Sequence, residues 1–214
     1  MEQERRLDTS GAVWEQLAGK RIILAGIDSQ QKQRFQQSLV DKCSQMGEAF
    51  AVSEGLETAG EDDHVFLFSS MERAEELDLL LGQLKLLSQK RVASAVLVSD
   101  NRVYGKLFGT AHRLTEQELG YACHTDANDR IVTNMRLAEH LAYRMAGEGV
   151  PIRIVRMDAV QAGMLEAAVK VLLKGISGEV YNLPAMAEAG TERSPLSPIG
   201  VMTDTSKVET ININ

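Results

Sequence analysis

Short apolar runs and helical apolar patterns alternate along most of the chain. The runs are brief and mostly apolar, and those at 21–26 and 93–99 are of the type buried on both faces of a parallel sheet. They lie at 21–26, 49–52, 65–68, 93–99, 152–155 and 179–183. The segments between them carry apolar residues at three- and four-residue spacing, which predicts helices. These helices are expected at 35–46, 72–90, 129–146 and 159–174, after a short amphipathic stretch around Trp14 and Leu17.

Strands that alternate with helices predict an α/β protein. The expected arrangement is a doubly wound parallel sheet with helices on both faces and right-handed crossovers. The 214 residues, 44% of them apolar, are enough for one domain with a sizeable core. We expect this domain to span 1–184. Residues 185–214 show no clear periodicity, and they are predicted to form an irregular C-terminal tail.

Charge and composition exclude several classes of partner. The net charge of −7 would repel a phosphate backbone, and no Lys/Arg cluster with interleaved aromatic residues offsets it, so nucleic acid is not expected to bind. No apolar run approaches the roughly 20 residues of a membrane span. The polar start of the chain, 1–8, differs from a signal peptide, so we expect no membrane contact and a cytoplasmic protein.

The metal-binding residue types show no ligand spacing. Cys43 and Cys123 lie far apart without a Cys-x-x-Cys motif, which predicts buried thiols rather than a disulfide or a zinc site. No His-x-x-x-His motif is present, and all the histidines are expected to be solvated loop residues. They are His64, His112, His124 and His140. No metal site is predicted.

Three stretches together resemble a known family. They are Leu97-Val98-Ser99-Asp100-Asn101-Arg102-Val103-Tyr104-Gly105, then Arg136-Leu137-Ala138-Glu139 leading to Gly149-Val150-Pro151-Ile152-Arg153-Ile154-Val155-Arg156, and Gly178-Glu179-Val180-Tyr181-Asn182-Leu183. In this order they are similar to the extended short-chain dehydrogenases/reductases, the NAD-dependent nucleotide-sugar epimerases and dehydratases. With the turn at 204–207, the resemblance spans 21–207. It implies a Rossmann-like fold.

The turn after the first strand departs from the family's glycine-rich loop. Glycines let the backbone approach a pyrophosphate at a helix start. Of the family's three glycines only Gly26 is present, and Ser29 and Lys32 stand where the other two are usual. Glu54, after the second strand, is placed as the acidic residue that would bind the adenosine ribose. Gly26 and Glu54 are therefore the candidate cofactor-binding residues.

The family's catalytic group is also replaced. The resemblance implies a tyrosine that transfers a proton, a lysine four residues later, and a serine or threonine that binds the substrate oxygen. These positions are occupied by Ile131, Met135 and Asp100, and Ser99 stands one step too early. Isoleucine and methionine have no ionisable proton. No working catalytic residue and no bound cofactor is therefore expected.

Two functions follow from these departures. The leading interpretation is a degenerate, non-catalytic family member that acts as a binding, assembly or regulatory partner. The alternative is an active NAD- or NADP-dependent enzyme in which Asp100, Tyr104 or Tyr121 transfers the proton. The substrate segment of the family is reduced in either case, because Arg156 is followed almost at once by the next helix.

A partner is expected on the helices at 72–90 and 129–146, through which members of the family commonly pair. Leu79 and Leu86 lie two turns apart, away from the leucines predicted to face the sheet. We therefore predict a homodimer, or a heterodimer with a related enzyme.

Overall fold

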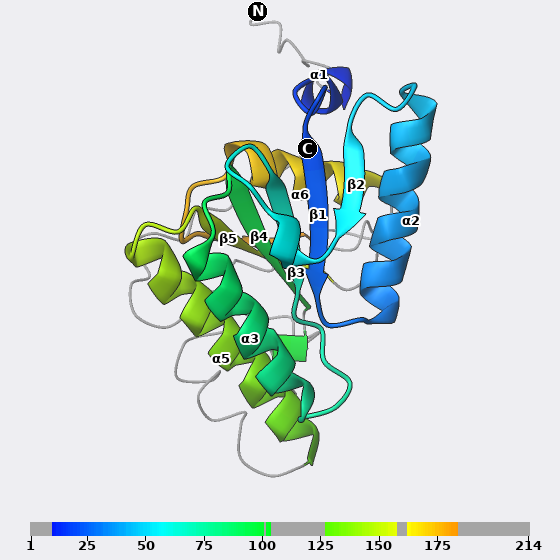
Figure 1. Cartoon of the computed structure of the whole chain (residues 1–214). Coiled ribbons are helices and arrows are strands. Elements are labelled where there is room, and N and C mark those ends of the chain that lie inside the picture. Colours follow the sequence, from blue (N-terminus) through cyan, green and yellow to red (C-terminus); the bar gives the residue numbers. More distant parts are fainter. Residues whose placement is uncertain (1–9, 101, 104–126, 158–161, 184–214) are drawn as a thin grey trace, which may run out of the picture.

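The computed structural model describes residues 10–100, 102–103, 127–157 and 162–183. In this part of the chain a six-stranded sheet has the order β2-β1-β3-β4-β5-β6, and every neighbouring pair is parallel. The strands are β1 (Arg21–Gly26), β2 (Ala51–Glu54), β3 (His64–Phe68), β4 (Ser94–Ser99), β5 (Ile152–Arg156) and β6 (Val180–Asn182). Figure 1 shows them with helices on both sides. The predicted doubly wound parallel sheet is confirmed.

The helices form two outer layers. They are α1 (Ser10–Glu15), α2 (Gln30–Gln45), α3 (Glu76–Gln89), α5 (Ala127–Gly147) and α6 (Ala162–Lys174), with a short 3-10 turn η1 (Leu56–Thr58). Helices α3 and α5 lie side by side on one face of the sheet, and α1, α2 and α6 cover the other (Figure 1). The chain therefore leaves β1 toward one face and leaves β3 toward the opposite face.

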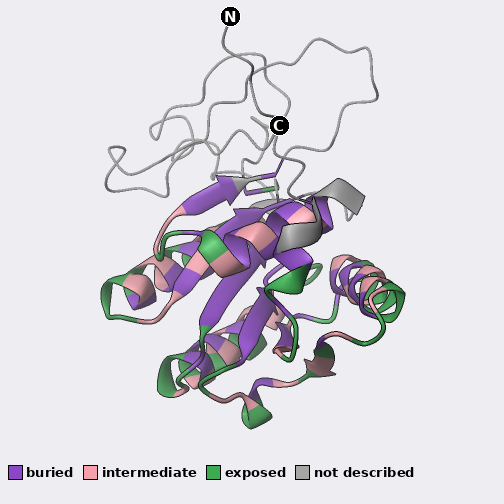
Figure 2. Ribbon diagram, turned by 90° about the horizontal axis from the view of Figure 1, so that it is seen from above, coloured by how far each residue is buried: buried purple, intermediate pink, exposed green. Residues whose placement is uncertain are grey.

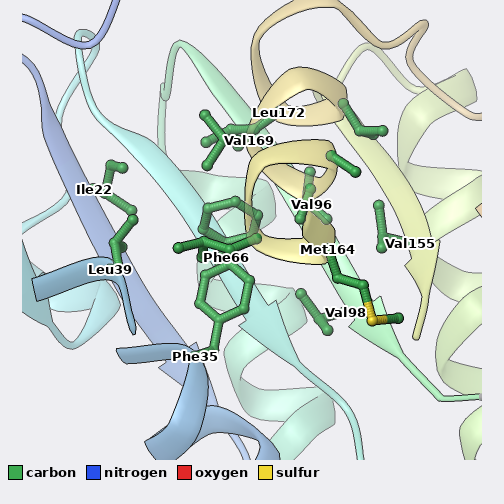
Figure 3. Close-up of a cluster of buried hydrophobic side chains, with 14 of the residues drawn as sticks. Ile22, Phe35, Leu39, Phe66, Val96, Val98, Val155, Met164, Val169 and Leu172 are labelled. Carbon is green, nitrogen blue, oxygen red and sulfur yellow. The ribbon is translucent and has the colours of Figure 1, made fainter. Parts of the chain in front are cut away.

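Alternating strand residues supply two separate cores. Ile23 belongs to the cluster under α3 and α5, whereas Ile22 and Leu24 belong to the cluster under α1, α2 and α6. Because both faces are covered, the interiors of the central strands β1, β3 and β4 are continuously apolar rather than alternating with polar residues. Figure 2 shows the buried strands between partly exposed helices. Figure 3 shows Phe35 beside Phe66 in the second of these cores. The Phe35 ring packs edge-to-face with the rings of Phe66 and Phe68, with centroids 4.7 and 5.3 Å apart.

Most strand boundaries agree with the sequence pattern to within one residue, but α2 begins at Gln30 rather than at residue 35, and one strand is displaced. The strand expected at 49–52 lies at Ala51–Glu54. Phe50 is buried for another reason, because its ring stacks on Trp14 with centroids 6.1 Å apart. Helix α3 begins at Glu76 rather than at residue 72. The Glu76 carboxylate accepts hydrogen bonds from the backbone N–H groups of Glu72 and Arg73, which holds the segment before the helix against its first residue.

The expectation that every histidine is solvated is wrong for His64. It begins β3, is 7% exposed, and its Nδ1 lies 2.7 Å from Ser94 Oγ on β4. Burial lowers the pKa of this imidazole. His140 is exposed as predicted, but on helix α5 rather than in a loop, and Cys43 is a buried thiol as predicted. His112, His124 and Cys123 lie outside the described residues, as do Tyr104, Tyr121 and the tail at 185–214.

No helix within the described ranges is both long enough and apolar enough to span a lipid bilayer.

Candidate functional site

The candidate site lies at the carboxyl ends of β1 and β3. Here the neighbouring strands lead to helices on opposite faces, since β1 continues into α2 and β3 continues toward α3. In open parallel sheets, ligands bind outside the carboxyl ends of the strands at such a switch point. The predicted site residues Gly26, Glu54 and Asp100 all lie at this edge, at or just beyond the ends of β1, β2 and β4.

The packing of the sheet itself requires glycine at position 26. Its φ is 93°, and a Cβ added here would lie 2.3 Å from the carbonyl oxygen of Phe68. The next residue, Ile27, donates its backbone N–H to the same oxygen at 2.8 Å. Close approach of β1 to β3 therefore requires glycine at this position, whether or not a pyrophosphate binds.

The start of α2 is capped by its own chain. Ser29 is the N-cap residue, and its Oγ accepts a hydrogen bond from the Lys32 backbone N–H at 3.2 Å. Ser29 and Lys32 are both buried. Gln31 Nε2 donates to the carbonyl oxygen of Met157 at 2.6 Å, which ties the first turn of α2 to the end of β5. A helix start presents free N–H groups to an anion, and the serine hydroxyl takes one of them.

Glu54 is the last residue of β2, whereas the sequence pattern placed it just after the strand, and both of its carboxylate oxygens have partners. Lys32 Nζ lies 3.1 Å from Oε2, and Gln36 Nε2 donates to Oε1 at 2.8 Å. The hydrogen bond from Gln36 and the ion pair with Lys32 lower the pKa of Glu54. The carboxylate is therefore held in its ionised form by two side chains of α2.

Asp100 is buried within a small polar cluster. Ser70 Oγ donates to Oδ2 at 2.8 Å, Arg102 Nε donates to the same oxygen at 2.8 Å, and the Arg102 backbone N–H donates to Oδ1 at 2.7 Å. Arg102 Nη2 also donates to Ser70 Oγ at 2.8 Å. The carboxylate accepts from every one of these donors. Ser99 is fully buried, and its Oγ has no hydrogen-bond partner among the described residues.

The positions aligned with the tyrosine and the lysine are part of the core. Met135 is 0% exposed within the cluster beneath α3 and α5, and Ile131 packs against that cluster one turn earlier in α5. A methionine and an isoleucine hold no titratable proton there. Both side chains instead pack in the core beneath α3 and α5.

Sequence reasoning missed a buried ion pair between α5 and the sheet. Arg156 Nε and Nη2 donate to Glu139 Oε1 and Oε2 at 3.0 and 2.5 Å, and the two side chains are 4% and 1% exposed. Both residues belong to the stretches that resemble the family, yet nothing in the sequence pairs them. Their contact depends on how α5 lies across β5.

No group of three or more His, Cys, Asp or Glu side chains within the described ranges is arranged to hold a metal ion.

The sheet order, the helices on both faces and the switch point define a Rossmann-like α/β protein. No family model matches the chain, and no curated protein matches it either. Among solved structures it is similar to a GDP-L-fucose synthetase from Naegleria fowleri, at 10% identity and a TM-score of 0.45, over 64% of this chain and 54% of that one. The same enzyme bound to NADP gives 10% identity and a TM-score of 0.42, over 64% and 53%. The chain thus spans about half the length of these structures, and the likeness is one of fold alone.

Proposed function

We propose that this protein is a non-catalytic relative of the nucleotide-sugar epimerases and dehydratases that works as a binding, assembly or regulatory partner. The observation that carries the proposal is the burial of Met135, with Ile131 packed against the same core. Proton transfer requires an ionisable group within hydrogen-bond reach of the reacting atom. The two positions where the family resemblance implies such groups hold apolar side chains that pack the domain.

The alternative is an active NAD- or NADP-dependent enzyme with substituted residues. Asp100 is the only candidate of this alternative within the described residues, and hydrogen bonds from Ser70 and Arg102 occupy its carboxylate. We expect no conversion of UDP-, dTDP- or GDP-sugars in the presence of NAD or NADP, measured by product chromatography beside a working epimerase. Turnover by the wild type that disappears in Asp100→Asn would establish the alternative.

The proposed partner surface is the outer side of α3 and α5. These helices lie side by side (Figure 1), and each leaves one large apolar side chain exposed, Leu79 at 53% and Leu137 at 40%. Leu86, which the sequence pattern placed on the outer face, is instead partly buried against the core cluster that includes Leu56. The turn η1 also packs against α3.

Sedimentation tests whether this surface joins two copies of the chain. We expect the wild type to sediment as a dimer at micromolar concentration and the Leu79→Glu/Leu137→Glu variant to sediment as a monomer, because paired carboxylates would have to be buried without partners. Val40→Glu is the matched control: Val40 is 40% exposed but lies on α2, on the other face. A monomeric wild type, or loss of the dimer in Val40→Glu as well, would exclude a homodimer on α3 and α5.

A further inference from the structure

We propose that Lys32 closes the nucleotide-binding end of this sheet by occupying Glu54 from within the chain. The inference rests on the proposed function, because it explains how a Rossmann-like domain can keep a ribose-type carboxylate without accepting a dinucleotide. It concerns Lys32 as a residue that determines ligand specificity. The residues present at the switch point do not fit NAD or NADP. The Lys32–Glu54 contact is one cause of this, and a single substitution can remove it.

The contact joins the two parts of the fold between which a nucleoside ribose would lie. Lys32 is in the first turn of α2, after β1, and Glu54 is the last residue of β2, the neighbouring strand. Their charged atoms, Nζ and Oε2, are 3.1 Å apart. An acidic residue at the end of the second strand normally accepts hydrogen bonds from the ribose hydroxyls. Here Nζ of Lys32 and Nε2 of Gln36 each take one carboxylate oxygen.

Burial fixes the lysine more firmly than the glutamate. The Lys32 side chain is 9% exposed, whereas that of Glu54 is 54% exposed. The ammonium therefore cannot turn into water without the lysine stem leaving the position it packs in. A ribose hydroxyl would bring no charge of its own, whereas the Lys32 ammonium adds Coulomb attraction to its hydrogen bond with the Glu54 carboxylate. A nucleoside competes poorly for this carboxylate while Lys32 is present.

Calorimetric titration with ADP tests the proposal on purified, full-length protein. We expect no ADP binding to the wild type and a gain in affinity of roughly tenfold or more in Lys32→Ala, because Glu54 becomes available. Loss of a cation near the phosphates would by itself weaken ADP binding, so a gain has the opposite sign from the simple electrostatic effect. The gain should disappear in Lys32→Ala/Glu54→Gln.

Arg34→Ala is the matched control, since it removes one positive charge from an exposed position two residues later in α2. We expect it to behave as the wild type does. The proposal is overturned if Lys32→Ala binds ADP no more tightly than Arg34→Ala, or if its gain survives Glu54→Gln. NAD-dependent turnover by the wild type would instead overturn the proposed function, so the two failures are distinguishable.

A second measurement applies if Lys32→Ala folds poorly. Lys32→Met keeps most of the buried stem and removes the ammonium. Carbon-13 titration of the Glu54 carboxyl should then show its pKa moving toward the ordinary glutamate value, with the Gln36 hydrogen bond still present. An unchanged pKa would show that Lys32 does not occupy Glu54 in solution and would overturn the proposal.

Discussion

Met135→Lys, which restores the lysine that the family resemblance implies, is expected to destabilise the protein by about 4 to 5 kcal/mol at pH 7 rather than to create activity. Met135 is 0% exposed in the core beneath α3 and α5. The folded protein can bury a lysine at this position only in its neutral form. Its pKa in the folded protein is therefore expected to fall below 7, from about 10.4 in the unfolded chain. Each unit of that difference corresponds to about 1.4 kcal/mol.

The pH dependence separates this cause from a simple packing defect. A group whose pKa is depressed by folding binds its proton in the unfolded chain, so raising the pH toward the unfolded pKa restores stability. By urea unfolding, the deficit of Met135→Lys relative to the wild type should shrink to about 1 to 2 kcal/mol at about pH 9.5. Met135→Leu is the control, and it should cost less than about 1.5 kcal/mol at either pH. A stable Met135→Lys protein would show that this position reaches solvent, as a ribose-binding lysine requires.

The fold could be predicted from the sequence because the strands are buried on both faces. Residues 22–25 are all apolar, and the run at 21–26 forms β1 with the expected bounds. The second strand was predicted two residues too early, because Phe50 is buried against Trp14 and not in the sheet. Trp14 lies in a helix 36 positions earlier, so no local pattern shows this contact. Similarly, apolar spacing alone could not show that η1 packs against α3 and that Leu86 is partly buried against the core.

The sequence was enough to predict where the candidate site lies, but not which side chains contact one another there. Gly26, Glu54 and Asp100 could be placed at the carboxyl edge, because parallel strands end on the same side of a sheet. That Lys32 reaches Glu54 could not be predicted, since it depends on the register of β2 against β1 and on the rotamer of a long side chain. From the sequence, Lys32 replaces a glycine of the family's cofactor-binding turn. The structure shows that its ammonium contacts the Glu54 carboxylate.

The contact between Glu139 and Arg156 could not be predicted from the sequence either. Each residue could be identified from the sequence as part of a family-like stretch, but their contact joins α5 to β5 deep in the domain. Charged side chains are almost never fully buried unless they are paired. Because an unpaired charge here would be costly, we expect the pair to favour the placement of α5 in which Glu139 meets Arg156. The same helix carries Ile131 and Met135.

Arg156→Met is accordingly expected to destabilise the protein by about 3 to 5 kcal/mol, because it leaves the Glu139 carboxylate buried without its guanidinium. The double variant Glu139→Met/Arg156→Met should recover most of this loss, since burial of two apolar side chains removes the desolvation penalty as well as the attraction. Urea unfolding of Arg156→Met, Glu139→Met and the double variant, each compared with the wild type, gives the coupling energy. Arg144→Met is the matched control on the same helix: Arg144 lies 3.7 Å from Glu148, both side chains are about two-thirds exposed, and its loss should cost only about 0.3 kcal/mol. If Arg156→Met costs no more than Arg144→Met, the two charges are hydrated in solution and the pair does not hold α5 on the sheet.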